Sequence, residues 1–264
     1  MSRTGLCLSA FTAAALLPIA SAQPPAGGWA TLKGQIVFPA GKALPKRAPL
    51  VVNNDPKHCL SKGPILDDVL LVNDKSRGVR NVVVWLRPNN MVAKAALDPN
   101  EIHPSDKNRK AAKVEIDQPC CMFTPRVTLA RVGDTIVVKN PAPVAHNFFW
   151  TSANCGNFNP NIAPGQTWEM PQPLAAESAA IPYKCSFHSW MSGTVRVFDH
   201  PYYALTDDDG RFTMPNAPAG NYRLMVWHEK FGILGGPGGR FGTPIVIAGP
   251  ATDLPAMPFP ELAN

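Results

Sequence analysis

The sequence has no run of about 20 apolar residues after its first 22 positions, so nothing there predicts a membrane-spanning helix. It also has no long basic run: the formal net charge of +6 is spread along the chain, and only 17% of the residues are charged. Because no basic and aromatic motif accompanies this excess, we do not expect a nucleic-acid partner. The absence of a C-x-x-C-H motif excludes a covalently attached c-type haem on this chain.

The N-terminal residues have the pattern of an export signal. Arg3 supplies a positive charge, residues 6–20 form a short apolar stretch, and Ala20-Ser21-Ala22 is an A-x-A cleavage site. We therefore expect residues 1–22 to be removed, so that the mature chain begins at Gln23. Such a chain is expected to be periplasmic or secreted, with no membrane span.

Helix signals are scarce after residue 22, whereas short β-rich runs recur between turn-forming residues. The chain has 29 prolines and 20 glycines. Short strands between frequent turns predict an all-β protein, either a sandwich or a barrel. In one run Val195 and Val197 alternate with Arg196, so the valines should face a core and the arginine the opposite side. The strand-like runs are 32–38, 82–86, 126–139, 147–150, 194–198 and 222–227.

Five cysteines follow the predicted signal: Cys59, Cys120, Cys121, Cys155 and Cys185. Cysteines of an exported chain usually pair, and an odd number means that at least one has another role. If the first four form two disulfides, the adjacent Cys120 and Cys121 must each reach a distant partner. Cys185 then remains as a free thiol.

The stretch YKCSFHSWMSG at 183–193 brings Cys185, His188 and Met191 close together, and GDTIVVKNPAPVAHNFFW at 133–150 adds His146. Two imidazoles, a thiolate and a weak thioether suit copper that cycles between Cu(I) and Cu(II). Zinc gains little from a thioether, so Met191 favours copper. Because the thiolate must form for metal to bind, Cys185 should be deprotonated in the copper-loaded protein.

The spacing predicts how these ligands meet. Cys185 ends the strand-like run AAIPYKC and Met191 leads into SGTVRVF, so three ligands lie on one short loop between strands. His146 must come from a different strand, so the site joins distant parts of a sandwich. This anchoring would hold the geometry nearly constant between oxidation states, which favours fast electron transfer. The alternative is a buried free cysteine, two unrelated histidines and a packing methionine.

YKCSFHSWMSGTVRV resembles the C-terminal ligand loop of the small blue copper proteins, the cupredoxins, and its C-x2-H-x2-M spacing is similar to that of amicyanin. GDTIVVKN with the later His-Asn pair resembles their first-ligand segment. The step of 39 positions from His146 to Cys185 is also similar to amicyanin. The resemblance extends over about a third of the chain, residues 111–198.

The resemblance implies a Greek-key β-sandwich with one type 1 copper. Asn147 matches the family's asparagine that ties the two ligand segments together and tunes the thiolate. Two residues depart from amicyanin and plastocyanin: Phe187 replaces the proline before the loop histidine, and Trp190 directly precedes the axial ligand. Their bulk could shield His188, the usual electron-exit edge. The implied equatorial ligands are His146, Cys185 and His188, and the implied axial ligand is Met191.

The segment TDDDGRFTMPNAPAGNYRLMVW at 206–227 has tight-turn signals and alternating apolar residues. It resembles the carboxypeptidase-regulatory-like (transthyretin-like) β-sandwich. That family's first strands are similar to LKGQIVF at 32–38 and NVVVWL at 81–86, so the cupredoxin module is expected to be inserted in this second module, or fused to it. The expected division is a signal at 1–22, the second module at 23–110 and 199–264, and the cupredoxin domain at 111–198. The whole arrangement resembles exported bacterial proteins of the methylamine-utilisation or plastocyanin-like class.

The leading prediction is an exported one-electron carrier with a single type 1 copper. Its redox partner would be a protein such as a c-type cytochrome or a periplasmic dehydrogenase. The alternative is a binding protein that holds or delivers copper, or that adheres to carbohydrate or protein through the transthyretin-like module. Measuring electron self-exchange beside the rate of copper release separates a carrier from a copper-holding protein.

An enzyme is not expected. Copper nitrite reductases and multicopper oxidases need a second copper centre, commonly built from H-x-H pairs, and none occurs among the six histidines. A binuclear CuA centre needs a second cysteine in the ligand loop, which contains only Cys185. His228 and Glu229 have no identifiable third partner for acid–base chemistry, so they are interpreted as structural.

Overall fold

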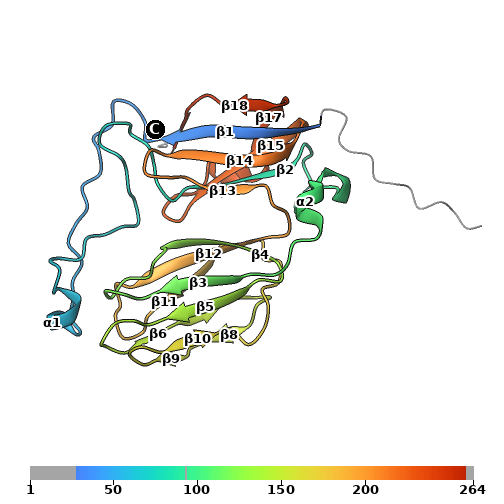
Figure 1. Cartoon of the computed structure of the whole chain (residues 1–264). Coiled ribbons are helices and arrows are strands. Elements are labelled where there is room, and N and C mark those ends of the chain that lie inside the picture. The colour runs from blue at the N-terminus through green and yellow to red at the C-terminus, as the bar shows by residue number, and fades with distance from the viewer. Residues whose placement is uncertain (1–27, 93, 260–264) are drawn as a thin grey trace, which may run out of the picture.

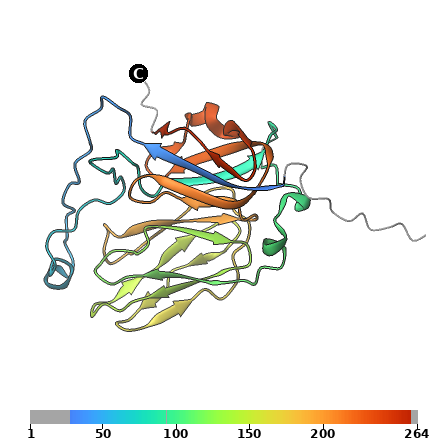
Figure 2. The same ribbon diagram turned by 45° about the horizontal axis from the view of Figure 1, so that its top comes forward.

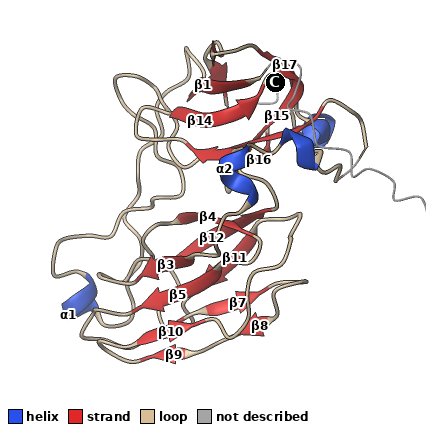
Figure 3. Cartoon of the chain, turned by 45° about the vertical axis from the view of Figure 1, so that its right-hand side comes forward, coloured by secondary structure: helices blue, strands red, loops and turns tan. Residues whose placement is uncertain are grey.

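A computed structural model describes residues 28–92 and 94–259 of this chain. Strands dominate it, which confirms the predicted all-β class. The strands form two stacked groups, which we name the upper unit and the lower unit after their places in Figure 1. Figure 3 shows how few helical turns interrupt them. The predicted signal at 1–22 lies outside the described residues.

Strands from both ends of the chain form the upper unit. β1 (Trp29–Val37) and β2 (Val83–Pro88) come before the lower unit in sequence. The others come after it: β13 (Tyr203–Leu205), β14 (Arg211–Pro218), β15 (Gly220–His228), β16 (Gly232–Ile233), β17 (Thr243–Ile247), β18 (Ala251–Asp253) and β19 (Met257–Pro258). One sheet has the order β14-β1-β18 with β19 also on β1, and the other has β13-β2-β15-β16 with β17 also on β15. Buried side chains from both sheets, among them Leu32, Leu86 and Val226, form one core.

The lower unit is continuous in sequence. Its sheets have the orders β10-β5-β3 and β4-β12-β11-β7-β8, and β6 pairs with β9. Their buried side chains form a second core that contains an aromatic group around Phe148. The strands are β3 (Lys113–Asp117), β4 (Val127–Arg131), β5 (Thr135–Lys139), β6 (His146–Asn147), β7 (Phe149–Thr151), β8 (Asn157–Phe158), β9 (Asn161–Ile162), β10 (Thr167–Glu169), β11 (Ile181–Lys184) and β12 (Ser192–Phe198).

The helical segments are short: α1 (Pro56–Cys59), α2 (Pro104–Lys107) and two 3-10 turns, η1 (Pro99–Glu101) and η2 (Gly236–Phe241). Each has a proline at its first or second position, where the missing N–H is not needed. No helix among the described residues has the length and apolar character to cross a membrane.

The predicted strand runs match observed strands, with interruptions where the backbone must turn. The run at 126–139 is divided into β4 and β5, because Gly133 adopts a positive φ of 90° between them. The run at 147–150 is divided between β6 and β7 at Phe148, which is fully buried. Strict alternation survives in β11, where Ile181 and Tyr183 are buried and the residues after each are exposed.

The two units share an apolar interface. It contains Val83, Trp85 and Met225 of the upper unit and Val127 and Phe198 of the lower unit. On β12, Val195 and Val197 belong to the lower core, and Arg196 lies on the opposite face. The upper unit covers that face as well, so Arg196 is only 7% exposed, with its guanidinium carbon 4.5 Å from the centre of the Trp85 ring.

Residues 49–66, which we name the strap, extend from the upper unit along the lower unit. Figures 1 and 2 show α1, inside the strap, beside the lower unit and away from the upper sheets. Leu50, Val52 and Ile65 pack against the lower core. A short bridge between Pro49 and Leu66 brings the two ends of the strap together.

A disulfide between Cys59 and Cys121, which are 62 positions apart, fastens the strap to the lower unit. Of the four disulfide candidates, Cys59 and Cys121 pair, whereas Cys120 and Cys155 are free among the described residues, so the arrangement with two disulfides does not occur there; Cys185 is free, as that arrangement also required. Cys121 is fully buried, whereas the side chain of the adjacent Cys120 is half-buried. The Cys155 sulfur instead accepts a hydrogen bond from the backbone N–H of Ala175 at 3.3 Å.

Candidate metal centre

Three predicted ligands converge on one buried point in the lower unit. The Nδ1 atoms of His146 and His188 are 3.0 Å apart. The Cys185 Sγ lies 4.0 Å from the first nitrogen and 3.6 Å from the second. All three side chains are at most 1% exposed. His146, Cys185 and His188 therefore form a group able to hold a metal ion.

These separations fit a three-coordinate soft metal. Ligands at 120° around an ion with ordinary metal–nitrogen and metal–sulfur bonds are about 3.6 Å apart for two nitrogens and about 3.8 Å apart for nitrogen and sulfur. The observed nitrogen–sulfur distances bracket that value. The two imidazole nitrogens need to separate by about 0.6 Å, which small side-chain rotations supply, so the residues present fit a His2Cys copper centre.

Local structure explains why these side chains meet. Cys185 directly follows β11 and Met191 directly precedes β12, and these strands pair with each other. The backbone N–H of Cys185 donates to the carbonyl of Met191 at 3.1 Å, and that of Met191 donates to the carbonyl of His188 at 2.8 Å. These two bonds close the loop into a tight turn. His146 is in β6, which β9 holds from the other side.

Asn147 makes three polar contacts, and two of them reach the segment that carries Cys185. Its backbone N–H points at the Cys185 Sγ at 3.4 Å. Its side-chain oxygen accepts a hydrogen bond from the backbone N–H of Ser186 at 2.6 Å. Its side-chain amide donates to Asn159. Contacts of this kind orient a ligand and reduce the electron density on its sulfur.

The electrostatic environment keeps the imidazoles neutral, which is the form that binds metal. The pKa of His146 is lowered to about 4, mainly by burial, with smaller lowering effects from His188 and His58 and an opposing effect from Asp55. Burial also lowers the pKa of His188, against the raising effect of a hydrogen bond to Asp55. The His146 Nε2 is buried and has no hydrogen-bond partner among the described residues, so its Nδ1 is the nitrogen that faces the other ligands.

Met191, the predicted axial ligand, is fully buried in the same core. The two residues expected to surround the electron-exit edge, Trp190 and Phe187, differ in exposure. Trp190 is 9% exposed, and its ring centre is 5.1 Å from that of His188. Phe187 is 39% exposed, and its carbonyl accepts a hydrogen bond from Asn54 of the strap. Trp190 therefore packs against the ligand, whereas the side chain of Phe187 faces outwards.

The strap supplies a contact that the sequence did not predict. The Nε2 of His188 lies 3.0 Å from the Asp55 carboxylate, and His188 is 0% exposed. Asp55 adopts a left-handed backbone conformation and its carbonyl accepts hydrogen bonds from the N–H groups of His58 and Cys59. The strap thus covers the ligand edge. The only sequence signal at this position is Cys59, a cysteine whose partner the sequence does not specify.

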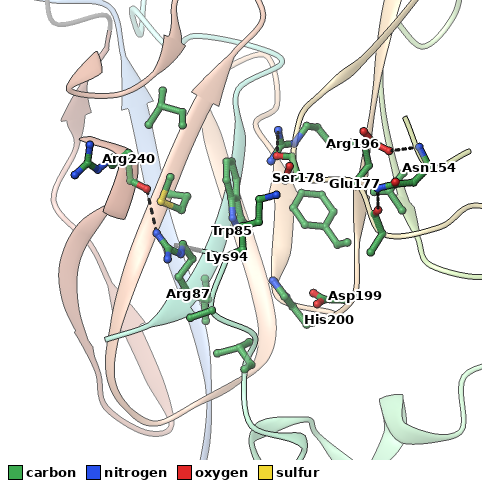
Figure 4. Close-up of a pocket in the computed structure, with 18 residues that line it drawn as sticks. Trp85, Arg87, Lys94, Asn154, Glu177, Ser178, Arg196, Asp199, His200 and Arg240 are labelled. Atoms are coloured by element: carbon green, nitrogen blue, oxygen red, sulfur yellow. Dashed lines mark hydrogen bonds between the residues drawn. The ribbon is translucent and has the colours of Figure 1, made fainter. Parts of the chain in front are cut away.

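A separate pocket of about 400 Å3 lies between the two units, shown in Figure 4. Arg87 donates to the carbonyl of Arg240 on one side, and Glu177 accepts from Asn154 on the other. Burial lowers the pKa of Arg196 in its wall to about 10. None of the predicted metal ligands lines this pocket, so it is distinct from the metal centre.

No protein-family model and no curated protein sequence matches this chain. Among solved structures, a purple cupredoxin from Nitrosopumilus maritimus is 27% identical, with a TM-score of 0.27 over 32% of this chain and 98% of that one. A reduced Cu(I) form of an amicyanin variant is 22% identical, with a TM-score of 0.28 over 36% and 88% of the two chains. A copper-containing nitrite reductase from Thermus scotoductus is 20% identical, with a TM-score of 0.30 over 40% and 27%. These matches are all partial, and they do not show the transthyretin-like module.

Proposed function

We propose that this chain is a mononuclear type 1 copper protein that carries one electron between redox partners. The observation that supports this most directly is the convergence of two imidazole nitrogens and one thiol sulfur, 3.0 to 4.0 Å apart, in a fully buried position. A His2Cys set with a thioether nearby is the arrangement that selects copper in blue electron-transfer sites. The proposed ligands are His146, Cys185 and His188, with Met191 as the axial ligand.

Copper, when bound, supplies the one-electron couple. The protein's own contribution is a fixed and dry environment. The Cys185 sulfur accepts a hydrogen bond from the Asn147 N–H, and the loop that carries it is closed by backbone hydrogen bonds. Because burial excludes water and the ligands come from paired strands, their geometry should change little when the charge changes. With four protein ligands, no position stays open for a substrate, so the proposed role is not catalytic.

The cellular setting belongs to the same proposal. The export signal pattern supports a periplasmic or secreted location, where a c-type cytochrome or a dehydrogenase would be a suitable redox partner. The exposed Phe187 is on the ligand loop, next to His188, so it is the natural place for such a partner to approach.

The visible spectrum of the copper-loaded protein tests the proposal. Wild type with Cu(II) should be intensely coloured through thiolate-to-copper charge transfer, and a reductant should bleach it reversibly. Cys185→Ser should lose this band. Cys155→Ser is the matched control, since Cys155 is also a buried free cysteine but lies outside the ligand group. Colourless wild type with Cu(II) in ordinary tetragonal geometry would contradict the proposal.

A second function, copper holding or delivery, is favoured by one observation. His188, the ligand on the loop, is covered by Asp55 of the strap and has no exposed surface. A covered ligand edge slows electron exchange with a partner but does not prevent metal storage. A carrier should show fast electron self-exchange and slow release of copper to a chelator. Slow self-exchange with rapid copper release would favour the delivery function instead.

A further inference from the structure

The disulfide of the strap lies directly beside the proposed copper ligand His188. The sulfur atoms of Cys59 and Cys121 and a ring nitrogen of His188 all lie within 4.8 Å of one another, and all three residues are buried. This group shares His188 with the proposed copper centre but contains neither His146 nor Cys185. Two sulfur atoms and an imidazole therefore already lie together at a second candidate metal site.

The surroundings of these sulfurs hold them in place. The Trp190 indole N–H donates to the carbonyl of Cys121 at 3.0 Å, so the ligand loop packs on the residue that carries one sulfur. The N–H of Cys59 donates to the carbonyl of Asp55, whose side chain contacts His188. His58 precedes Cys59, and its Nε2 is buried without a hydrogen-bond partner among the described residues. None of these contacts is made by the sulfur atoms, and Leu50, Val52 and Ile65 hold the strap on the lower core as well, so the two sulfurs should stay near each other after reduction.

We propose that the Cys59–Cys121 disulfide is reducible, and that the two thiols so formed bind one Cu(I) ion beside His188. Thiolates are the ligands that select Cu(I), and two of them suffice for this ion. The binding itself stands on these residues alone. Its meaning as a loading position, from which copper moves to the neighbouring centre, rests on the proposed function.

The chemistry balances with a dithiol as the reductant. The dithiol gives two electrons and two protons to the disulfide and becomes a disulfide itself, while the sulfur–sulfur bond of Cys59–Cys121 breaks to give two thiols. Binding of Cu(I) then releases both protons and forms two copper–sulfur bonds. Exchange with another disulfide, which takes up the two electrons and two protons and becomes a dithiol, re-forms the Cys59–Cys121 bond once Cu(I) has left, and this removes the site. Whether Cys59 and Cys121 are reduced or joined by a disulfide thus decides whether the chain has a second copper site.

Counting bound Cu(I) per chain tests the proposal. A full-length background variant, Cys120→Ser with Cys155→Ser, removes the other free thiols outside the copper centre. Its disulfide is reduced anaerobically with a phosphine, which takes the oxygen of a water molecule to become the phosphine oxide while the two hydrogens go to the thiols, and Cu(I) is titrated against bicinchoninate. We expect one copper before reduction and two after it. Adding Cys59→Ser and Cys121→Ser should give one copper in both states.

A second measurement needs no change at the site. Copper loaded into the reduced background should protect Cys59 and Cys121 from alkylation, detected by peptide mass spectrometry. Adding Cys185→Ser separates the two proposals, because it should abolish the blue band while the copper that appears on reduction remains. A reduced background that binds no additional copper, or additional copper that persists without Cys59 and Cys121, would overturn the proposal.

Discussion

Both ring nitrogens of His188 face a specific side chain. Its Nδ1 faces His146 and Cys185, and its Nε2 faces the Asp55 carboxylate. A carboxylate that accepts a hydrogen bond from the far nitrogen of a metal-bound histidine fixes the ring and raises its basicity. At the scale of single residues, Asp55 is therefore a positioning residue of the proposed copper centre, although the strap brings it from far away in the sequence.

Asp55→Ala should weaken copper binding. Loss of a carboxylate behind a ligating histidine typically lowers metal affinity by about 10- to 100-fold. Competition with a chelator of known affinity measures the change. Asn54→Ala is the matched control, because Asn54 is the neighbouring strap residue and its hydrogen bond goes to the carbonyl of Phe187 and not to a proposed ligand side chain. Equal affinities for the two variants would remove Asp55 from this role.

His228 predicts a dependence of stability on pH. Burial, with Arg126 and Lys230 nearby, lowers its pKa to about 4 from an ordinary 6.5. Between these values the unfolded chain binds a proton at this position that the folded protein does not, so stability should fall as the pH drops from 6.5 to 4. The loss is on the order of 3 kcal/mol for a shift of this size. Urea unfolding of the copper-free protein should show a shallower decline for His228→Gln, and an unchanged decline would exclude His228 as the cause.

At this scale the sequence singled out the proposed ligands and Asn147, but it did not single out Asp55. His146, Cys185, His188 and Met191 stand in a short pattern, because one tight loop and one strand carry them. Asp55 contacts His188 only because a disulfide and an apolar segment bring the strap to the lower unit. No local pattern encodes such a contact.

The elements around the ligand loop meet at Arg126. Its guanidinium, which is 7% exposed, pairs with Asp68 and Glu229 and donates to Ser192 at the start of β12. Burial lowers the pKa of Arg126, but these two carboxylates outweigh it and raise the pKa overall. Arg126 thus joins the segment after the strap, the beginning of β4, the end of the ligand loop and the end of β15.

Arg126→Met should destabilise the fold strongly. Removing one partner of a buried ion pair leaves uncompensated charge and typically costs about 3–5 kcal/mol. Here two carboxylates would remain near each other. Lys113→Ala is the matched control, because the Lys113–Glu169 pair is exposed and such pairs contribute less than about 1 kcal/mol. Chemical unfolding measures the free energy of unfolding of both variants. If Arg126→Met lost as little stability as Lys113→Ala, the ion pairs of Arg126 would not stabilise the fold.

The strands could be predicted because the alternation of apolar residues and the turn-forming residues are features of short stretches of sequence. β12 and β15 appear where apolar and polar residues alternate, and the turn at Gly133 needs a residue that tolerates positive φ. The disulfide pairing was not predictable. Cys120 and Cys121 are adjacent, and only the fold determines which of them points to Cys59.

At the scale of the whole molecule, Arg196 is a cation between the two units with no anionic partner among the described residues. Its guanidinium lies near the rings of Trp85, Phe198 and Trp227, at 4.5, 5.8 and 5.6 Å. Its Nε is buried and has no hydrogen-bond partner in the part of the chain that the structure describes. Stacking on aromatic rings therefore compensates for burial of this charge.

Arg196→Lys should be less stable than Arg196→Met. A lysine ammonium is more strongly hydrated than a guanidinium and cannot stack as a plane, so its burial is less favourable by about 1–2 kcal/mol. Methionine keeps an apolar side chain and removes the charge. Thermal unfolding of both variants gives the order, and a lysine variant as stable as wild type would show that stacking contributes nothing.

The division of the upper unit between both ends of the chain has a consequence for the order of folding. β1 and β2 are synthesised first, but the strands that pair with them all come after residue 198. The lower unit, by contrast, has all its strands by that residue. A chain that emerges from its N-terminus can therefore bring the proposed copper ligands together, and close the strap over them, before the strands that complete the upper unit have been synthesised.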